Sequence, residues 1–433
     1  MNNLVKYGTL AATLAIGVGW LSVGSFSDQL VGNHKMFSGA PSCKNTEWCN
    51  QIRDLFIVDA HNDTLLHRDP AKAAKAGHVD LARLVDGGVD LQIFAIASVT
   101  PKIKTQNGKP CGDLAAGDRL KTFFVLKEPL RPATWLSPMG RVDRMIERFD
   151  RAVSRQKENG ANFKRIASKE DLKALTKPGE GALKSVGAVL AIEGAYWASE
   201  DKGELQSQFD KLEDAGVLMV GMTHRSSNHL AGSNEDCSNR HGLTELGRFF
   251  VAEVWRRGMV LDLAHASSET IADVAELSVA GNGGPVVVSH TGIKAACNHD
   301  RNLSDEDVRN VVRSGGVVAI GFWSTVNCFP PKTTAEEARN LVSHSFASAY
   351  EILNTPEFLA EMGTKFDPAN HLALGSDFDG ATLVPYDASG IPWYLEGLHL
   401  LQTNNGARFN ADALKKIAGG NMFRMIQSTL KSG

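Results

Sequence analysis

The chain has 433 residues, of which 43% are hydrophobic and 22% are charged, and its formal net charge is −3. This composition is that of a soluble globular protein, long enough for one large α/β barrel or for two ordinary domains. The near-neutral charge, without a dense Lys/Arg cluster and interleaved aromatic residues, argues against nucleic acid as a partner.

Residues 1–27 differ from the rest of the chain. No residue between Lys6 and Asp28 is charged, and the apolar centre runs from about Leu10 to Val23. A cationic start followed by an apolar run is typical of a secretory signal peptide or of an uncleaved N-terminal membrane anchor. A buried first helix of the domain is the less favoured interpretation. No clear small-residue cleavage site follows, so removal and retention stay open. Either way we expect an exported protein, periplasmic or anchored on the extracytoplasmic side.

The cysteine content agrees with export. The chain has six cysteines, an even number, and none forms a C-x-x-C pair: Cys43, Cys49, Cys111, Cys237, Cys297 and Cys328. In an oxidising compartment these predict disulfides, although six cysteines allow 15 pairings. Six unpaired thiols in a cytosolic enzyme are the competing interpretation. Residues 28–51, rich in Gly, Pro, Ser and Asn, read as a linker.

From residue 52 onward, apolar segments alternate with helical patterns. Near-continuous Val/Ile/Leu runs are what strands buried on both faces require. The predicted strands are Leu55–Ala60, Val89–Ser98, Val186–Ile192, Val217–Thr223, Met259–Ala264, Pro285–Ser289, Val317–Phe322 and His371–Ser376. Helical patterns in the intervals include Arg141–Asn159, Leu243–Arg257 and Ala335–Leu353.

Eight alternating β/α units predict a (β/α)8 TIM-like barrel over residues 52–433. The interval from Thr100 to Ser185 is too long for one crossover, so it must hold an insertion between the second and third strands. An open doubly wound sheet is the alternative, but no G-x-G-x-x-G follows a strand.

Polar residues stand at the carboxyl ends of most predicted strands. They are His61 and Asp63, Glu193, His224, His265, His290 and Asp377. In a barrel these ends converge on one face, where active sites are built. Imidazole and carboxylate ligands in this number suit a borderline metal such as zinc and exceed the needs of one tetrahedral site. The pattern predicts a dinuclear centre, which would lower the pKa of a bridging water and polarise a carbonyl group for hydrolysis.

Other polar residues near these strands are not expected to bind metal. His229, His241 and His299 lie in loops. Asp379 shares a face with Asp377 but is expected to support it or to form a turn. Asp262 precedes His265 by three residues, so on a regular strand it points the other way.

Several linked segments resemble the membrane (renal-type) dipeptidase family of zinc peptidases. The similarity runs from about Asp54 to the C-terminus, in the family's order and spacing. The segments are DAHNDT, AIEG, MTHRSSN, GLTELGRFFVAEVWRRGMVLDLAH, VVVSHTG, CNHDRNLSDE, LGSDFDG and GGNMFRM.

The resemblance implies a role for each matching residue. His61 and Asp63 would bind one zinc ion, His265 and His290 the other, and Glu193 would bridge both. Asp377 would hold the bridging water and pass its proton to the leaving amine. His224 would donate a hydrogen bond to the carbonyl oxygen as it becomes an oxyanion. Arg301 would bind the free carboxylate of the substrate, for which a guanidinium group is well shaped; otherwise a loop arginine would be expected to pair with a nearby aspartate.

The resemblance also implies a Cys297–Cys328 disulfide and activity on dipeptides, including those with a C-terminal D-residue. Members of the family are commonly dimers, so a homodimer is possible for this chain. By elimination, Cys111–Cys237 and Cys43–Cys49 are guesses. Mammalian members carry an apolar C-terminal tail for a lipid anchor. This chain ends Gln-Ser-Thr-Leu-Lys-Ser-Gly, so any membrane attachment is expected at the N-terminus.

Two other functions are compatible with parts of this pattern. Another dinuclear amidohydrolase, such as a lactonase or deaminase, would often bridge its metals with a carboxylated lysine, but here Glu193 stands at the third strand end. A barrel that has lost catalysis and only binds would show gaps among the ligands or the proton-handling acid, and the sequence shows none.

Overall fold

The computed structural model describes residues 34–39, 50–52, 54–106, 108–155, 161–176, 185–237, 240–401 and 409–431. Residues 1–27, Cys43 and Cys49 lie outside these ranges, so the predictions made for them concern undescribed residues. Within the described ranges, no helix is both long and apolar enough to cross a membrane.

Eight parallel strands close into a barrel, because β3 pairs with β2 on one side and with β7 on the other. The strands, in order around the barrel, are β2 (Ile57–Asn62), β3 (Val89–Ala97), β7 (Ser185–Glu193), β8 (Val217–Gly221), β9 (Val260–Asp262), β10 (Val286–Thr291), β11 (Val317–Ile320) and β12 (Leu372–Leu374). All eight predicted strands are confirmed, and the closure excludes the open doubly wound sheet.

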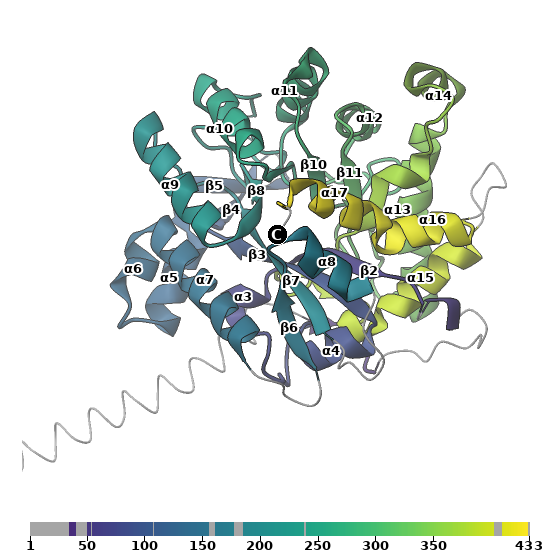
Figure 1. Cartoon of the computed structure of the whole chain (residues 1–433), viewed down its shortest axis with the longest axis horizontal. Coiled ribbons are helices and arrows are strands. Elements are labelled where there is room, and N and C mark those ends of the chain that lie inside the picture. The colour runs from purple at the N-terminus through teal and green to yellow at the C-terminus, as the bar shows by residue number, and fades with distance from the viewer. Residues whose placement is uncertain are drawn as a thin grey trace, which may run out of the picture.

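Helices surround the barrel and cover the outer face of its strands (Figure 1). They are α3 (Thr64–His67), α4 (Leu81–Asp86), α5 (Arg119–Lys127), α6 (Pro132–Leu136), α7 (Pro138–Ser154), α8 (Lys169–Thr176), α9 (Lys202–Asp214), α10 (Glu245–Arg256), α11 (Ser268–Leu277), α12 (Asp305–Arg313), α13 (Ala335–Leu353), α14 (Pro356–Met362), α15 (Ile391–Leu400), α16 (Ala411–Lys415) and α17 (Asn421–Thr429). The three helical patterns read from the sequence correspond to α7, α10 and α13.

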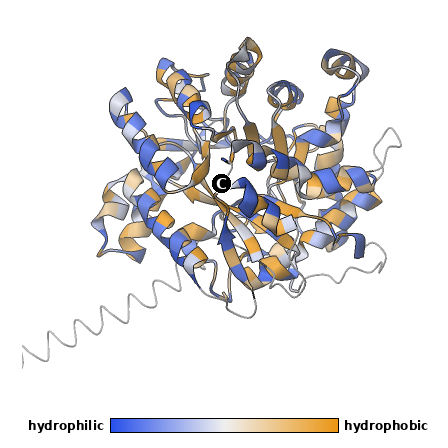
Figure 2. Cartoon of the chain, in the orientation of Figure 1, coloured by the Kyte–Doolittle hydropathy of each residue, from blue (hydrophilic) through white to orange (hydrophobic). Residues whose placement is uncertain are grey.

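The strands are apolar on both faces because they separate two cores. The barrel interior is filled by small and branched side chains such as Val58, Ala60 and Val189, and the larger core lies between strands and helices. Figure 2 shows the resulting pattern, with hydrophobic strands inside helices whose outer faces are polar. Helix α17 covers the amino-terminal end of the barrel, where Met422 and Met425 join the interior cluster. The opposite, carboxyl-terminal end is left for the site.

The predicted insertion lies between β3 and β7. It begins with an antiparallel hairpin of β4 (Pro101–Gln106) and β5 (Lys109–Asp118), continues through α5, α6 and α7, and ends in β6 (Asn162–Arg165) and α8. Strand β6 pairs with the first half of β7, before β8 begins its own pairing with that strand. Helices α5 and α6 extend to the left of the barrel in Figure 1.

Two disulfides in the described part of the chain lie at the carboxyl-terminal end of the barrel. Cys297 is bonded to Cys328, which confirms the pairing implied by the resemblance, and Cys111 is bonded to Cys237, which confirms the pairing guessed by elimination. The second bond ties β5 of the insertion to the loop after β8. The short pair of β1 (His34–Lys35) and β13 (Leu383–Val384) holds the start of the described chain against the loop after β12.

Candidate metal centre and substrate pocket

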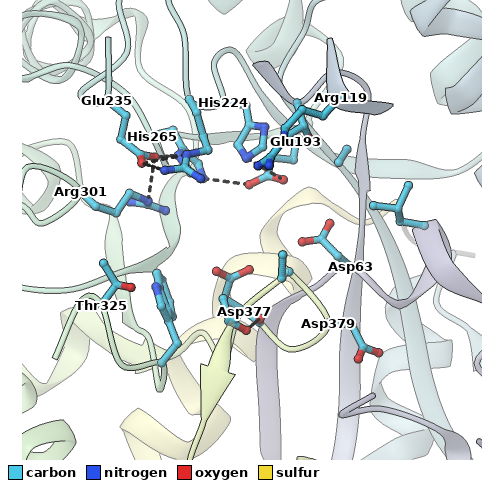
Figure 3. A pocket seen from close by; sticks show the side chains of 18 of the residues that line it. Asp63, Arg119, Glu193, His224, Glu235, His265, Arg301, Thr325, Asp377 and Asp379 are labelled. Carbon is cyan, nitrogen blue, oxygen red and sulfur yellow. Dashed lines mark hydrogen bonds and ion pairs between the residues drawn. The ribbon is translucent and has the colours of Figure 1, made fainter. Parts of the chain in front are cut away.

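Six of the seven strand-end residues meet in one buried cluster. His61, Asp63, Glu193, His265, His290 and Asp377 are each at most 8% exposed. The Glu193 carboxylate lies at its centre, because its Oε1 is 3.0 Å from Nε2 of His265, 3.3 Å from Nε2 of His290 and 3.8 Å from Nε2 of His61. Figure 3 shows Asp63 and Asp377 facing Glu193 and His265 across the pocket. A carboxylate in this position can bridge two ions.

The backbone bends sharply where two of these residues leave their strands. His265 and Asp377 have φ angles of 65° and 56°, in the left-handed region that non-glycine residues seldom adopt. Gly380 approaches the site so closely that a Cβ there would lie 2.1 Å from Oδ1 of Asp377. Close packing therefore holds the Asp377 carboxylate in place.

The expected orientation of Asp262 is wrong. Strand β9 ends at Asp262, and the chain then turns into the left-handed conformation at His265, so the two residues do not alternate as they would on a regular strand. The Asp262 carboxylate accepts a hydrogen bond of 2.6 Å from Oγ of Ser289, the same hydroxyl that contacts Nδ1 of His290.

Hydrogen bonds at the Nδ1 atoms fix the protonation of three rings. Nδ1 of His265 lies 2.9 Å from a carboxylate oxygen of Glu235. Because the Ser289 hydroxyl donates to Asp262, it accepts from Nδ1 of His290 at 2.9 Å and from Nδ1 of His61 at 3.3 Å. In the neutral rings each Nε2 is therefore a lone pair aimed into the cluster.

This arrangement fits metal ions. The Nε2 atoms of His265 and His290 are only 3.1 Å apart, and two facing lone pairs need a cation between or beside them. His61 Nε2 and Asp63 Oδ1 are buried without a hydrogen-bond partner. Among the described residues, three groups have ligand atoms close enough to hold an ion: His61–His290–Asp377, Glu193–His224–His265 and His61–Asp63–Glu193.

The electrostatics of the cluster also favour cations. Burial lowers the pKa of His61, but Asp63 and the charges of Glu193 and Asp377 outweigh it and raise this pKa to about 10. Burial raises the pKa of Asp377 well above its ordinary value, and the negative charges of Asp63 and Glu193 add to the effect. The site thus attracts positive charge, as protons or as metal ions.

His224 lies at the edge of the cluster. Its Nε2 is 3.9 Å from Oε2 of Glu193, and its Nδ1 is 2.9 Å from the carbonyl oxygen of Val99. A carbonyl oxygen can only accept, so Nδ1 carries the proton. Burial lowers the pKa of the His224 ring to about 4 despite the nearby negative charge of Glu193.

The cluster opens into a cavity of about 670 Å³ that Arg301 and Trp323 also line. Arg301 is 4% exposed, and its Nη2 donates to the carbonyl oxygen of His290 at 2.7 Å. Its Nη1 is buried without a hydrogen-bond partner. The guanidinium carbon lies 5.9 Å from the centre of the Trp323 ring. A buried guanidinium with a free nitrogen can take up an anionic group.

Three charged residues of the pocket escaped the sequence analysis. Glu235, Arg225 and Arg119 all line the cavity. Glu235 forms an ion pair with Arg225, whereas Arg119 is exposed and has no ion pair with any residue in the described ranges. Burial raises the pKa of Glu235, but Arg225, His265 and Arg301 together hold it well below its ordinary value. All three lie in loops or at a helix start, where no strand periodicity marks them.

The residues not expected to bind metal lie outside the three metal-capable groups found in the described ranges. Nδ1 of His299 accepts from the backbone N–H of Arg301, and Nδ1 of His241 contacts the carbonyl oxygen of Gly242. The buried Asp379 carboxylate accepts hydrogen bonds from Arg68, from Oγ1 of Thr64 and from the backbone N–H of His78. It supports the loop that carries Asp377.

A parallel barrel with imidazole and carboxylate ligands at its carboxyl-terminal end defines a metal-dependent hydrolase. The sequence model of the membrane dipeptidase family (peptidase family M19) matches residues 49–432. The chain therefore belongs to the membrane dipeptidase family, whose members are metallopeptidases that cleave a peptide bond.

Relatives and solved structures agree with this membership. The chain is 25% identical to dipeptidase tcpJ of Claviceps purpurea over 387 residues, which are 88% of this chain and 75% of the relative. It is 28% identical to dipeptidase aclJ of Aspergillus oryzae over 242 residues, or 56% of this chain and 51% of that protein. A metallopeptidase from Rhodobacter sphaeroides, solved with a phosphinate mimic of L-Ala-D-Ala, shares the fold with a TM-score of 0.60 and 22% identity, covering 87% of this chain and 99% of that one.

Proposed function

We propose that this protein is a dizinc peptidase that hydrolyses dipeptides carrying a free C-terminal carboxylate, including those with a C-terminal D-residue. One observation carries the proposal. Three imidazole Nε2 atoms converge on the Glu193 carboxylate, in a pocket that also presents the unpartnered Nη1 of Arg301.

His61 and Asp63 would hold one zinc ion, His265 and His290 the other, and Glu193 both. The mixed nitrogen and oxygen ligands suit zinc, and the Nε2 lone pairs that face into the cluster are available to bind it. Two such ions would supply an activated water and a polarised carbonyl group. The remaining chemistry falls to the side chains around them.

Asp377 would move the proton. Its Oδ1 lies 4.0 Å from Nε2 of His61, on the side of the cluster that opens to the cavity. Burial and neighbouring carboxylates raise its pKa, so it can hold a proton and give it to the leaving amine. In the folded protein the left-handed backbone at Asp377 keeps the carboxylate pointing to this position.

His224 would stabilise the oxyanion that develops on the substrate carbonyl. Because Nδ1 already donates to the carbonyl oxygen of Val99, Nε2 can donate only when the ring is the imidazolium cation. A negative charge developing beside Nε2 favours that form, so the hydrogen bond would strengthen as the transition state is approached.

Arg301 would bind the C-terminal carboxylate. Its Nη2 is held by the carbonyl oxygen of His290, its Nη1 has no hydrogen-bond partner, and the Trp323 ring lies beside the guanidinium. The Rhodobacter sphaeroides structure with the L-Ala-D-Ala mimic supports a dipeptide as ligand and a D-residue at the C-terminal position, by analogy of fold.

Export is part of the proposal. The two disulfides of the described chain favour an oxidising compartment. Together with the apolar stretch before Asp28, they support residues 1–27 as a signal peptide or membrane anchor and residues 28–51 as a linker. A homodimer stays a prediction.

The test is hydrolysis of a panel of L-L and L-D dipeptides by purified protein. One dipeptide has an amidated C-terminus, and each reaction is run as isolated, after chelation, and after zinc is restored. We expect zinc-dependent cleavage of free dipeptides and little cleavage of the amidated one. Protein that carries two metals per chain but cleaves no dipeptide would overturn the proposal and favour another amide or a lactone as substrate.

A further inference from the structure

Glu235 is a buried acid of the pocket that has no part in the proposed chemistry. Glu235 lies in the loop after β8 and is 7% exposed. Its carboxylate contacts His265, in the metal cluster, and Arg301, in the substrate pocket. Oε2 is 2.9 Å from Nδ1 of His265 and 3.8 Å from Nε of Arg301. Oε1 is 3.0 Å from Nε and 2.9 Å from Nη2 of Arg225.

The backbone around Glu235 is fixed from several sides. Its carbonyl oxygen accepts a hydrogen bond of 3.0 Å from the N–H of Gly112, on β5 of the insertion. The Cys111–Cys237 disulfide joins the neighbouring residues of the same two segments. The N–H of Asn234 donates to the carbonyl oxygen of His265 at 3.0 Å. The loop is therefore attached both to the insertion and to the residue that Glu235 contacts.

The contact decides how His265 can act. A carboxylate can only accept, so the proton of the neutral ring stays on Nδ1 and Nε2 remains a lone pair. A carboxylate partner also makes the ring a stronger ligand. The hydrogen bond at His290 is weaker, because Nδ1 of that ring contacts the neutral Ser289 hydroxyl and not a carboxylate. The hydroxyl in turn donates to Asp262.

We propose that Glu235 is a positioning residue that fixes His265 as a metal ligand and, through the same carboxylate, orients Arg301 at the end of the pocket that binds the substrate carboxylate. The role of Glu235 in orienting Arg301 rests on the proposed function. Its role in fixing His265 rests only on the contact between the two side chains. Glu235 thus links the geometry of one metal position to the binding of the dipeptide end.

The experiment compares Glu235→Gln and Glu235→Ala with a matched control, Glu253→Gln. Glu253 is 5% exposed and pairs with Arg256 at 2.7 Å and Arg257 at 3.4 Å, but it lies on α10, outside the pocket. The control therefore reports the general effect of neutralising a buried glutamate between arginines. Thermal unfolding of each variant shows whether it folds.

The first readout is zinc binding, measured as metal content per chain across a series of buffered zinc concentrations. We expect Glu235→Gln to weaken one of the two metal positions by about 10- to 100-fold, the size usual for a partner of a metal-binding histidine. Glu235→Ala should weaken it further, because Gln can still accept from Nδ1. Glu253→Gln should bind zinc like the unchanged protein.

The second readout separates kcat from KM with zinc saturating. We expect KM for a free dipeptide to rise in both Glu235 variants, because Arg301 loses its orienting partner, and KM for the amidated dipeptide to change little. Zinc affinity and KM equal to those of Glu253→Gln would overturn the inference. If the unchanged protein binds two zinc ions but cleaves no dipeptide, the proposed function fails, while the zinc series still decides the role of Glu235.

Discussion

The floor and the wall of the pocket are built in different ways. The floor consists of the strand-end residues His61, Asp63, Glu193, His265, His290 and Asp377, all at most 8% exposed. The wall consists of Arg119, Arg225, Glu235, Arg301 and Trp323, which come from the insertion and from loops and range from the buried Arg301 to the exposed Arg119. The pairing of the barrel strands fixes the floor, whereas contacts between distant loops fix the wall. We infer that the floor carries the chemistry and the wall selects the substrate.

If this division holds, the largest loss of rate should come from the floor. Asp377→Asn is expected to lower kcat by about 10²- to 10⁴-fold, because the side chain can no longer accept and deliver a proton. KM and metal content should stay close to those of the unchanged protein, and metal analysis provides the control. An unchanged kcat in a variant that holds both metals would remove Asp377 from the proton transfer.

His224 lies where floor and wall meet. His224→Ala is expected to lower kcat by about 10²- to 10³-fold, the usual effect of losing one donor to an oxyanion. Steady-state kinetics with a good dipeptide substrate provides the measurement. A large rise in KM at constant kcat would instead show that His224 binds the ground state and the transition state equally well.

The wall should govern KM more than kcat. Arg301→Met is expected to raise KM for free dipeptides by roughly 10- to 100-fold, since a charge-assisted hydrogen bond contributes about 1.5–3 kcal/mol. The amidated dipeptide should be affected much less. Arg119→Met is the matched control, because Arg119 lines the same cavity but is exposed. This substitution should leave KM unchanged for free dipeptides whose side chains are uncharged. Equal effects of the two substitutions would argue against a specific carboxylate site at Arg301.

The smallest effect on rate is expected from removing the Cys297–Cys328 disulfide, which joins the loops after β10 and β11. Replacing both Cys297 and Cys328 with serine should lower the free energy of unfolding by about 2–4 kcal/mol, because the unfolded chain gains freedom. At saturating substrate kcat should hardly change, since neither residue lines the floor. Denaturant unfolding and kcat, measured on the same preparation, test both parts.

Much of the fold can be read directly from the sequence. Strands buried on both faces must be apolar runs, so each barrel strand was visible as a segment such as Val186–Ile192. The bounds of α13 (Ala335–Leu353) match the predicted helix, which begins directly after the N-cap residue Thr334; the side chain of Glu337, in the first turn, completes the capping box. The insertion was predicted from its length, and within it only α7 (Pro138–Ser154) was predicted from a helical pattern, because the hairpin and the shorter helices carry no strong periodicity.

The sequence predicts the residues of the cluster for the same reason. A strand that ends in His, Asp or Glu marks its last residue in the sequence, and closure of the barrel brings those residues together. The orientation of Asp262 was wrong because strand alternation assumes a regular backbone, while the chain leaves β9 three residues before His265 and turns left-handed there.

Sequence alone therefore determined the barrel, the His, Asp and Glu residues that gather at its strand ends and the family, since these depend on local patterns and on motifs in a fixed order. Only the tertiary structure decided which groups support them. Glu235 reaches His265 across 30 residues of sequence and Arg301 across 66, and it is held by Gly112 of the insertion. Such contacts have no period and no fixed spacing. They arise only when loops from separate strands are packed over one end of the barrel.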